Sequence, residues 1–73
     1  MSERPSEIQK LANIAADREL PADLRTKAME QLGNIGTHDT LLILLELAAN
    51  TELATEERDF ALQEAREIIK SGH

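Results

Sequence analysis

Few side chains in this sequence have the type and spacing that catalysis or metal binding requires. His38 stands beside Asp39, the other histidine is the final residue His73, and there is no cysteine. A zinc site usually needs three or four ligands that converge from fixed elements, and two distant histidines do not meet this need. We therefore expect no catalytic residue, no metal and no cofactor.

Paired carboxylates are the remaining candidates for chemistry. Glu56 and Glu57 are adjacent, and Glu64 and Glu67 lie one helical turn apart. Two carboxylates act as an acid–base pair only when they share a desolvated cleft. These glutamates occupy helical positions that usually face water, and the sequence has no Gly-rich phosphate loop and no nucleophile elbow. We predict that the protein is not an enzyme.

Length, charge and composition exclude several classes of partner. The chain has 73 residues, too few for two separate cores, so residues 1–73 form a single predicted domain. There are 14 acidic residues against 8 basic ones, and the net charge is −6. Phosphate-rich partners need clustered Lys and Arg, and stacked bases need aromatic rings, of which Phe60 is the only one. We expect neither nucleic acid nor membrane as a partner.

Neither the amino-terminal residues nor the apolar runs have the pattern of a targeting signal. Met1 to Pro5 lack the charged and apolar regions of a signal peptide. The longest apolar run, Leu41 to Leu45, is far shorter than the roughly 20 residues that span a bilayer. Together with the lack of cysteine for disulfides, this predicts a soluble cytoplasmic protein.

Four segments carry apolar residues at the spacing of amphipathic helices. Ser6 and Gln9 have the pattern of a capping box at the start of the first segment. Pro21 suits the first position of the second, and the fourth runs from Thr55 to Lys70. No window alternates with period two between turn signals, so the predicted class is all-α.

The junction between the second and third segments has clear stop and start signals. Gly36 predicts a left-handed helix end, and Thr37 or Asp39 can cap a helix from Thr40 to about Ala49. The inward faces are expected to carry Leu24, Ala28, Leu32 and Ile35 in the second helix, and Leu41, Leu44, Leu45, Leu47 and Ala48 in the third.

The chain contains an internal repeat, in which residues 8–35 align without gaps with residues 41–68. Eight of the 28 aligned positions are identical. A helical hairpin cannot cover its own apolar face, so two such units must stack. We expect repeat 1 at about 6–36 and repeat 2 at about 38–70, and we call two aligned residues counterparts. The identical residues of repeat 1 are Leu11, Ala15, Ala16, Glu19, Leu20, Arg25, Ala28 and Ile35.

Two runs of residues resemble a HEAT repeat. They are Leu24-Arg25-x-x-Ala28-x-x-x-Leu32-Gly33-x-Ile35-Gly36 and Leu41-Leu42-x-Leu44-Leu45-x-Leu47. The chain is most similar to the short HEAT-like units of phycobilisome-lyase-type proteins. The resemblance implies a four-helix fragment of an α-solenoid, built from two stacked antiparallel hairpins, in which the second helices line a binding surface. The contact residues implied in this way are Lys27, Glu30, Gln31, Asn34, Asp59, Gln63 and Arg66.

Arg25 and Arg58 are counterparts in the two repeats. One interpretation makes them contacts for an anionic group of a partner. The other, which we favour, is structural: the resemblance implies that each guanidinium binds a carboxylate or a turn carbonyl of its own or the adjacent hairpin, and arginine suits such fixed, multi-donor contacts.

The third segment and Phe60 supply further candidate contacts. Leu42 and Ile43 stand where repeat 1 has the polar residues Gln9 and Lys10, so the third helix is apolar nearly all round. Either this helix lies between the other three, or Leu42 or Ile43 reaches a partner. Phe60 either plugs the end of the core or forms an exposed anchor.

These features favour a small scaffold or adaptor that binds a protein partner through its helical surfaces, with a homodimer as one version. The alternative is an acidic regulator that binds a basic protein surface or mimics nucleic acid. The net charge of −6 is the observation that suggests it. An enzyme subunit resembling the bilin lyases ranks last, because so short a chain offers too little surface for a tetrapyrrole.

Overall fold

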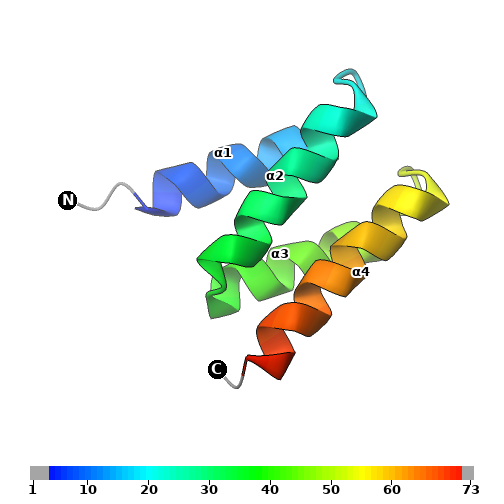
Figure 1. The fold of residues 1–73 in the computed structure, drawn as a ribbon. Coiled ribbons are helices and arrows are strands. Elements are labelled where there is room, and N and C mark those ends of the chain that lie inside the picture. Colours follow the sequence, from blue (N-terminus) through cyan, green and yellow to red (C-terminus); the bar gives the residue numbers. More distant parts are fainter. Residues whose placement is uncertain (1–3, 72–73) are drawn as a thin grey trace.

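The computed structural model describes residues 4–71, and His73 lies outside this range. Within it there are four helices and no strand, which confirms the predicted all-α class (Figure 1). The helices are α1 (Arg4–Ala16), α2 (Ala22–Ile35), α3 (His38–Ala48) and α4 (Thr55–Lys70).

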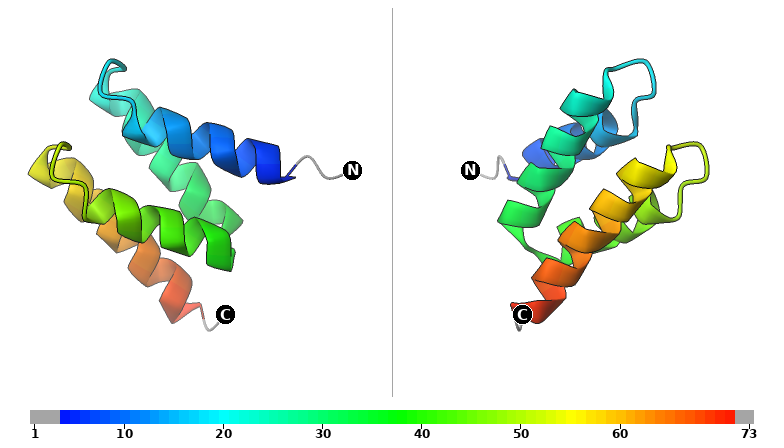
Figure 2. Two further views of the ribbon diagram at one scale, coloured as in Figure 1. Left: turned by 180° about the vertical axis from the view of Figure 1, so that it is seen from behind. Right: turned by 45° about the vertical axis from the view of Figure 1, so that its right-hand side comes forward.

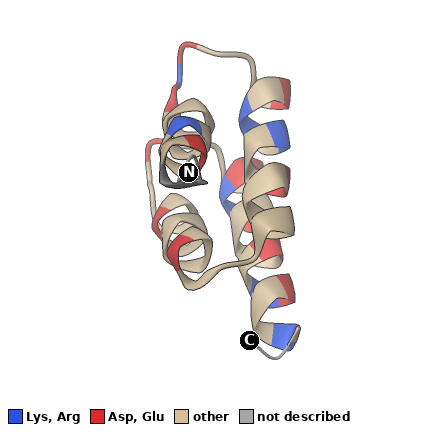
Figure 3. Cartoon of the chain, turned by 90° about the vertical axis from the view of Figure 1, so that its left-hand side faces the viewer, with Lys and Arg blue, Asp and Glu red and all other residues tan. Residues whose placement is uncertain are grey.

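The helices form two antiparallel hairpins, α1–α2 and α3–α4, that stack side by side (Figure 2). Helix α1 lies beside α3 in one layer, and α2 lies beside α4 in the other, as Figure 3 shows from the side. The smallest dimension, 16 Å, fits two layers of helices. The predicted architecture of two stacked hairpins is therefore present.

The turns inside the two hairpins have the same local geometry. The Glu19 amide donates to the Asp17 carboxylate over 3.0 Å, and the Glu52 amide donates to the Asn50 side-chain oxygen over 2.9 Å. Asp17 and Asn50 are counterparts, and so are Glu19 and Glu52. Asp and Asn favour such turns because their short side chains bond the backbone two residues on. The sequence repeat thus coincides with a repeated structure.

Three predicted helix starts are wrong by one to three residues, and one of them is that of α3, which begins at His38 and not at Thr40. Ser6 lies inside the first turn of α1, which begins at Arg4, so it does not cap that helix. Pro21 is the residue before α2, with φ −59° and ψ 149°, and its carbonyl accepts the amide of Arg25. Helix limits inferred from capping residues commonly err on this scale.

The junction between the hairpins agrees with its sequence signals. Gly36 has a φ of 65°, and its amide donates to the Leu32 carbonyl, so it ends α2 in the left-handed conformation. Thr37 caps α3: its hydroxyl accepts the Thr40 amide, and the Thr40 hydroxyl accepts the Thr37 amide. Only two residues separate α2 from α3, which fixes one hairpin against the other.

We predict that Gly36→Ala lowers the free energy of unfolding by about 1 kcal/mol, because a Cβ disfavours a positive φ. Asparagine tolerates this conformation better, so Gly36→Asn should cost less than Gly36→Ala. Urea unfolding followed by circular dichroism measures both. Equal costs for the two variants would mean that φ at this position is not what limits substitution.

The core lies between the two layers and receives side chains from all four helices. Met29, Leu32 and Leu44 are completely buried. Leu24 and Leu45 were expected to face inward, and this is wrong: their exposed fractions are 46% and 39%. The buried apolar residues are Ala15, Ala28, Met29, Leu32, Leu44, Leu47, Leu53, Ala61, Ala65 and Ile68.

Candidate protein-binding surfaces

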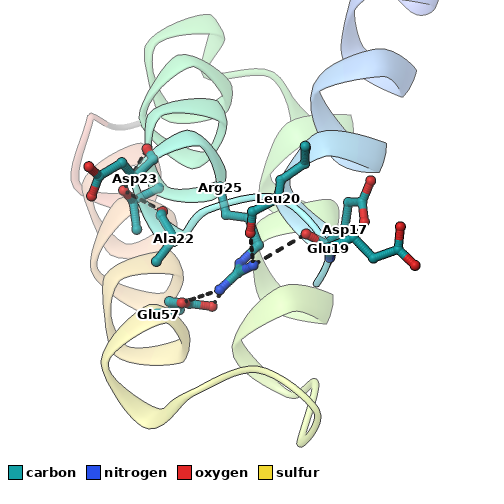
Figure 4. A network of polar contacts seen from close by, with 8 residues as sticks. Asp17, Glu19, Leu20, Ala22, Asp23, Arg25 and Glu57 are labelled. Atoms are coloured by element: carbon teal, nitrogen blue, oxygen red, sulfur yellow. Dashed lines mark hydrogen bonds and ion pairs between the residues drawn. The ribbon is translucent and has the colours of Figure 1, made fainter.

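A buried ion pair joins the two hairpins. Arg25 in α2 donates from Nε to Glu57 Oε1 over 3.1 Å and from Nη2 to Glu57 Oε2 over 2.6 Å (Figure 4). The two side chains are only 12% and 8% exposed. Nη1 of Arg25 also donates to the carbonyls of Leu20 and Asp17 in the turn of its own hairpin. Hydrogen bonding to the Glu57 carboxylate raises the pKa of Arg25 above its ordinary value.

The position of Glu57 corrects the prediction that this glutamate faces water. Its counterpart in repeat 1 is Leu24, so the repeat pattern carried no sign of a buried carboxylate. Glu57 is buried because the guanidinium of Arg25 arrives from the neighbouring hairpin and supplies two donors. The cause is a tertiary contact that local spacing does not encode.

Arg58 has a different environment from Arg25. Its Nε donates to the carbonyl of Ala48, in its own hairpin, over 3.3 Å. Within residues 4–71 no carboxylate pairs with it. Arg25 therefore links the hairpins, whereas Arg58 is bonded within repeat 2.

The other predicted contact residues do not form one continuous surface. Lys27, Gln31 and Asn34 are exposed along one side of α2, and Gln63 is exposed on α4. Leu42 is exposed on α3 in the other layer, and its neighbour Ile43 is half-buried against α1, where both line a shallow groove with Ile8 and Gln9.

Phe60 lies in a groove between α2 and α4. The ring is half-buried against the core and also lines the groove, so it is neither a complete plug nor a free anchor. The groove has a volume of about 450 Å³. Among residues 4–71 no basic residue lines it; its walls are formed by Ala22, Asp23, Thr26, Glu30, Glu56, Glu57 and Phe60.

Most large exposed apolar side chains gather at the two ends of the stack. Ile14 and Leu24 are the counterparts of Leu47 and Glu57, which face repeat 1 from repeat 2, so they lie on the outer edge of repeat 1. Leu45, Leu62 and Ile69 lie on the outer edge of repeat 2, which we call the α3–α4 edge. Leu42 instead borders the groove between α3 and α1.

The spacing of apolar residues does not predict the α3–α4 edge. It places Leu45 on the inward face of the third helix, and it assigns no role to Leu62 or Ile69. The repeat itself could have identified these residues. Repeat 2 covers one face of repeat 1, and among residues 4–71 no further hairpin covers the equivalent face of repeat 2.

Known proteins offer no independent assignment for these surfaces. No family model, curated protein or solved structure matches this chain. Among residues 4–71, no three His, Cys, Asp or Glu side chains are grouped as metal ligands would be. In the same range, no helix is both long enough and apolar enough to cross a bilayer. The function therefore has to follow from the protein's own surfaces.

Acidic residues are spread over all four helices, and basic residues lie among them (Figure 3).

Glu64 on α4 is unusual because its carboxylate lies over Gly33 of α2, where any Cβ would overlap it. Burial, followed by repulsion from Glu30 and Glu67, raises the pKa of Glu64 above its ordinary value of 4.5. The charged form of Glu64 is thus disfavoured in the folded protein.

This raised pKa predicts a pH dependence. The folded state holds the Glu64 proton more tightly than the unfolded state, so stability falls as pH rises from the unfolded pKa through the folded one. Glu64→Gln should therefore raise the melting temperature at neutral pH, and the difference should shrink below the unfolded pKa. Glu46→Gln, at an exposed position of α3, is the control. A gain for Glu64→Gln that is the same at all pH values would contradict the assignment.

Proposed function

We propose that this protein is a small non-enzymatic protein-binding module, a scaffold or adaptor that acts through its helical surfaces. The observation that supports this most directly is the α3–α4 edge, where Leu45, Leu62 and Ile69 are 39–57% exposed. Soluble monomers rarely expose contiguous apolar surface unless it binds something.

We also propose that the stack is HEAT-like. The matched turns at Asp17 and Asn50 support this proposal, as does the short junction at Gly36 and Thr37. In such a stack each hairpin presents one face to the next hairpin, so an unpaired terminal face is a natural binding surface.

The experiment that tests this function compares two charge insertions on α4. Leu62→Glu places a carboxylate on the α3–α4 edge, and Gln63→Glu adds the same charge at the adjacent exposed position on another side of the helix. Immobilised wild-type and variant proteins are incubated with native lysate, and bound proteins are identified by mass spectrometry. A partner that Gln63→Glu retains and Leu62→Glu loses would support the α3–α4 edge as the binding surface.

The opposite result, loss with Gln63→Glu alone, would move the site to the outer surface of α2 and α4, where Lys27, Gln31 and Asn34 lie. If no protein distinguishes the wild type from both variants, neither surface binds. Light scattering over a dilution series tests the homodimer version: a concentration-dependent mass that Leu62→Glu abolishes would identify a second copy as the partner.

A second candidate function is supported by the groove between α2 and α4. Its lining contains Asp23, Glu30, Glu56 and Glu57 with the ring of Phe60, and only Glu57 has a basic partner within residues 4–71. Such a groove suits a lysine or arginine side chain, which carboxylates attract and an aromatic face can contact. This favours a regulator that binds a basic segment. Mimicry of nucleic acid has less support, because the acids lie on all four helices.

Fluorescence anisotropy with a labelled Lys- and Arg-rich peptide tests the groove. Glu30→Gln should weaken binding severalfold and reduce its salt dependence, because it removes one carboxylate of the lining. Glu46→Gln changes the net charge by the same amount outside the groove and should have little effect. Equal losses for the two variants would show that the peptide responds to net charge rather than to the groove.

A further inference from the structure

The α3–α4 edge reproduces the face of repeat 1 that is covered by repeat 2. Met29 in α2 is completely buried, and its counterpart in α4, Leu62, is 41% exposed. Arg25 reaches across to Glu57 from the same side of α2, one helical turn before Met29. Arg58, Leu62 and Ile69 have the i, i+4 and i+11 spacing that places them on one side of α4.

The first helices of the repeats show the same relation. Ala12 of α1 lines a shallow groove against α3. Its counterpart is Leu45, which is exposed on α3. Both helices of repeat 2 therefore present outward the positions that repeat 1 uses to contact a neighbouring hairpin.

Charge adds specificity to this apolar edge. In repeat 1 the guanidinium of Arg25 receives a carboxylate from Glu57, which lies in the first turn of the neighbouring hairpin's second helix. Arg58 is the counterpart of Arg25, and the described residues give it one backbone acceptor, the Ala48 carbonyl, and no carboxylate. The edge thus lacks one acidic contact that the internal interface has.

A second copy of the chain, stacked head to tail, would not supply that carboxylate. The residue of repeat 1 at the Glu57 position is Leu24, so Leu24 of the next copy would meet Arg58. Lys27 would stand where Phe60 does. The outer edge of repeat 1 therefore does not complement the α3–α4 edge.

We propose that the α3–α4 edge docks a helical hairpin of a partner protein that offers apolar side chains to Leu45 and Leu62 and a carboxylate to Arg58. The hairpin stacks on repeat 2 as repeat 2 stacks on repeat 1. This inference rests on the proposed protein-binding function, and it specifies the chemistry of the partner.

A fusion protein tests the proposal. The full chain is extended by a flexible Gly-Ser linker and an appended copy of residues 37–71, which serves as the probe hairpin. The linker gives the hairpin a high effective concentration at the edge. Docking should raise the melting temperature of the full chain by about 5 °C or more, because ligands that bind only the folded state stabilise it.

Three variants of the fusion locate the contact. Leu62→Glu in the full chain should abolish the gain in melting temperature. Arg58→Gln in the full chain, or Glu57→Leu in the appended copy, should remove most of it. Each full-chain variant is also made without the hairpin, so that only the gain from docking is compared and any loss of the Arg58 bond to Ala48 cancels.

The proposal is overturned if the appended hairpin gives no gain, or if the gain survives both Arg58→Gln and Glu57→Leu. It is also overturned if the unfused chain dimerises through Leu62, because a second copy would then occupy the edge. One outcome is that the fusion gives no gain in melting temperature while a lysate protein binds the wild type and is lost with Leu62→Glu. That pair of results would reject this partner chemistry but keep the proposed function. If the fusion raises the melting temperature but no lysate protein depends on Leu62, the proposed function is rejected and the chemistry of the edge is kept.

Discussion

Arg25→Leu is expected to lower the melting temperature by on the order of 10 °C, a size typical of breaking a buried ion pair in a domain of this length. Glu57 would remain at a buried position, and Arg25 is the only side chain that donates to it within residues 4–71. Differential scanning calorimetry measures the shift. The reverse change, Glu57→Ala, should cost less, because Arg25 keeps the carbonyls of Leu20 and Asp17 as acceptors.

The double variant Arg25→Leu/Glu57→Leu should recover much of the loss, because two apolar side chains can replace a buried ion pair without leaving a charge unpaired. Arg18→Leu is the matched control: its ion pair with Glu52 is 3.7 Å long and well exposed, and such pairs contribute little. If Arg25→Leu and Arg18→Leu had the same small effect, the pair between the hairpins would not be structural.

Leu44→Ala is expected to reduce the free energy of unfolding by about 3 kcal/mol, because it removes buried methyl groups and leaves a cavity. Leu44 is fully buried in α3, in the cluster that includes Ala15, Met29 and Ala61 from the other three helices. Small domains are only marginally stable, so this change removes a large part of the total. Chemical denaturation followed by circular dichroism gives the value.

Leu42→Ala provides the control on the same helix, close to Leu44 in the sequence. Its side chain is 47% exposed, so the truncation should cost the isolated protein less than about 1 kcal/mol. If Leu42→Ala were as destabilising as Leu44→Ala, Leu42 would be buried in the core and would not border an open groove between α3 and α1.

The order and class of the helices could be predicted because their signals are local. Gly36 and Thr37 act through their own backbone and side-chain conformations. The end of α2 was therefore predicted correctly, and Thr37 is one of the two caps considered for α3, although α3 begins two residues before the predicted Thr40. The internal repeat correctly implied two stacked hairpins, because a hairpin with one apolar face needs a second to cover it.

The orientation of single residues was harder to predict because it depends on the neighbouring hairpin. Leu24 and Leu45 have the spacing of core residues, yet they face the open ends, because no further hairpin lies beyond them in residues 4–71. Glutamate is a residue type that usually lies on the surface, yet Glu57 is buried opposite Arg25. The groove at Phe60 likewise depends on how α2 and α4 pack, and helical periodicity within one segment carries no information about that packing.

The connections described above also bear on how rapidly the chain reaches its native state. Each hairpin closes through a short turn, at 17–21 and 49–54, and the step from α2 to α3 is shorter still. Most tertiary contacts are thus made between segments that follow one another, which gives a low contact order, and helical domains of this kind fold in microseconds to milliseconds. Little entropy is lost in closing long loops before packing begins, so partly folded chains with unprotected apolar edges should be short-lived.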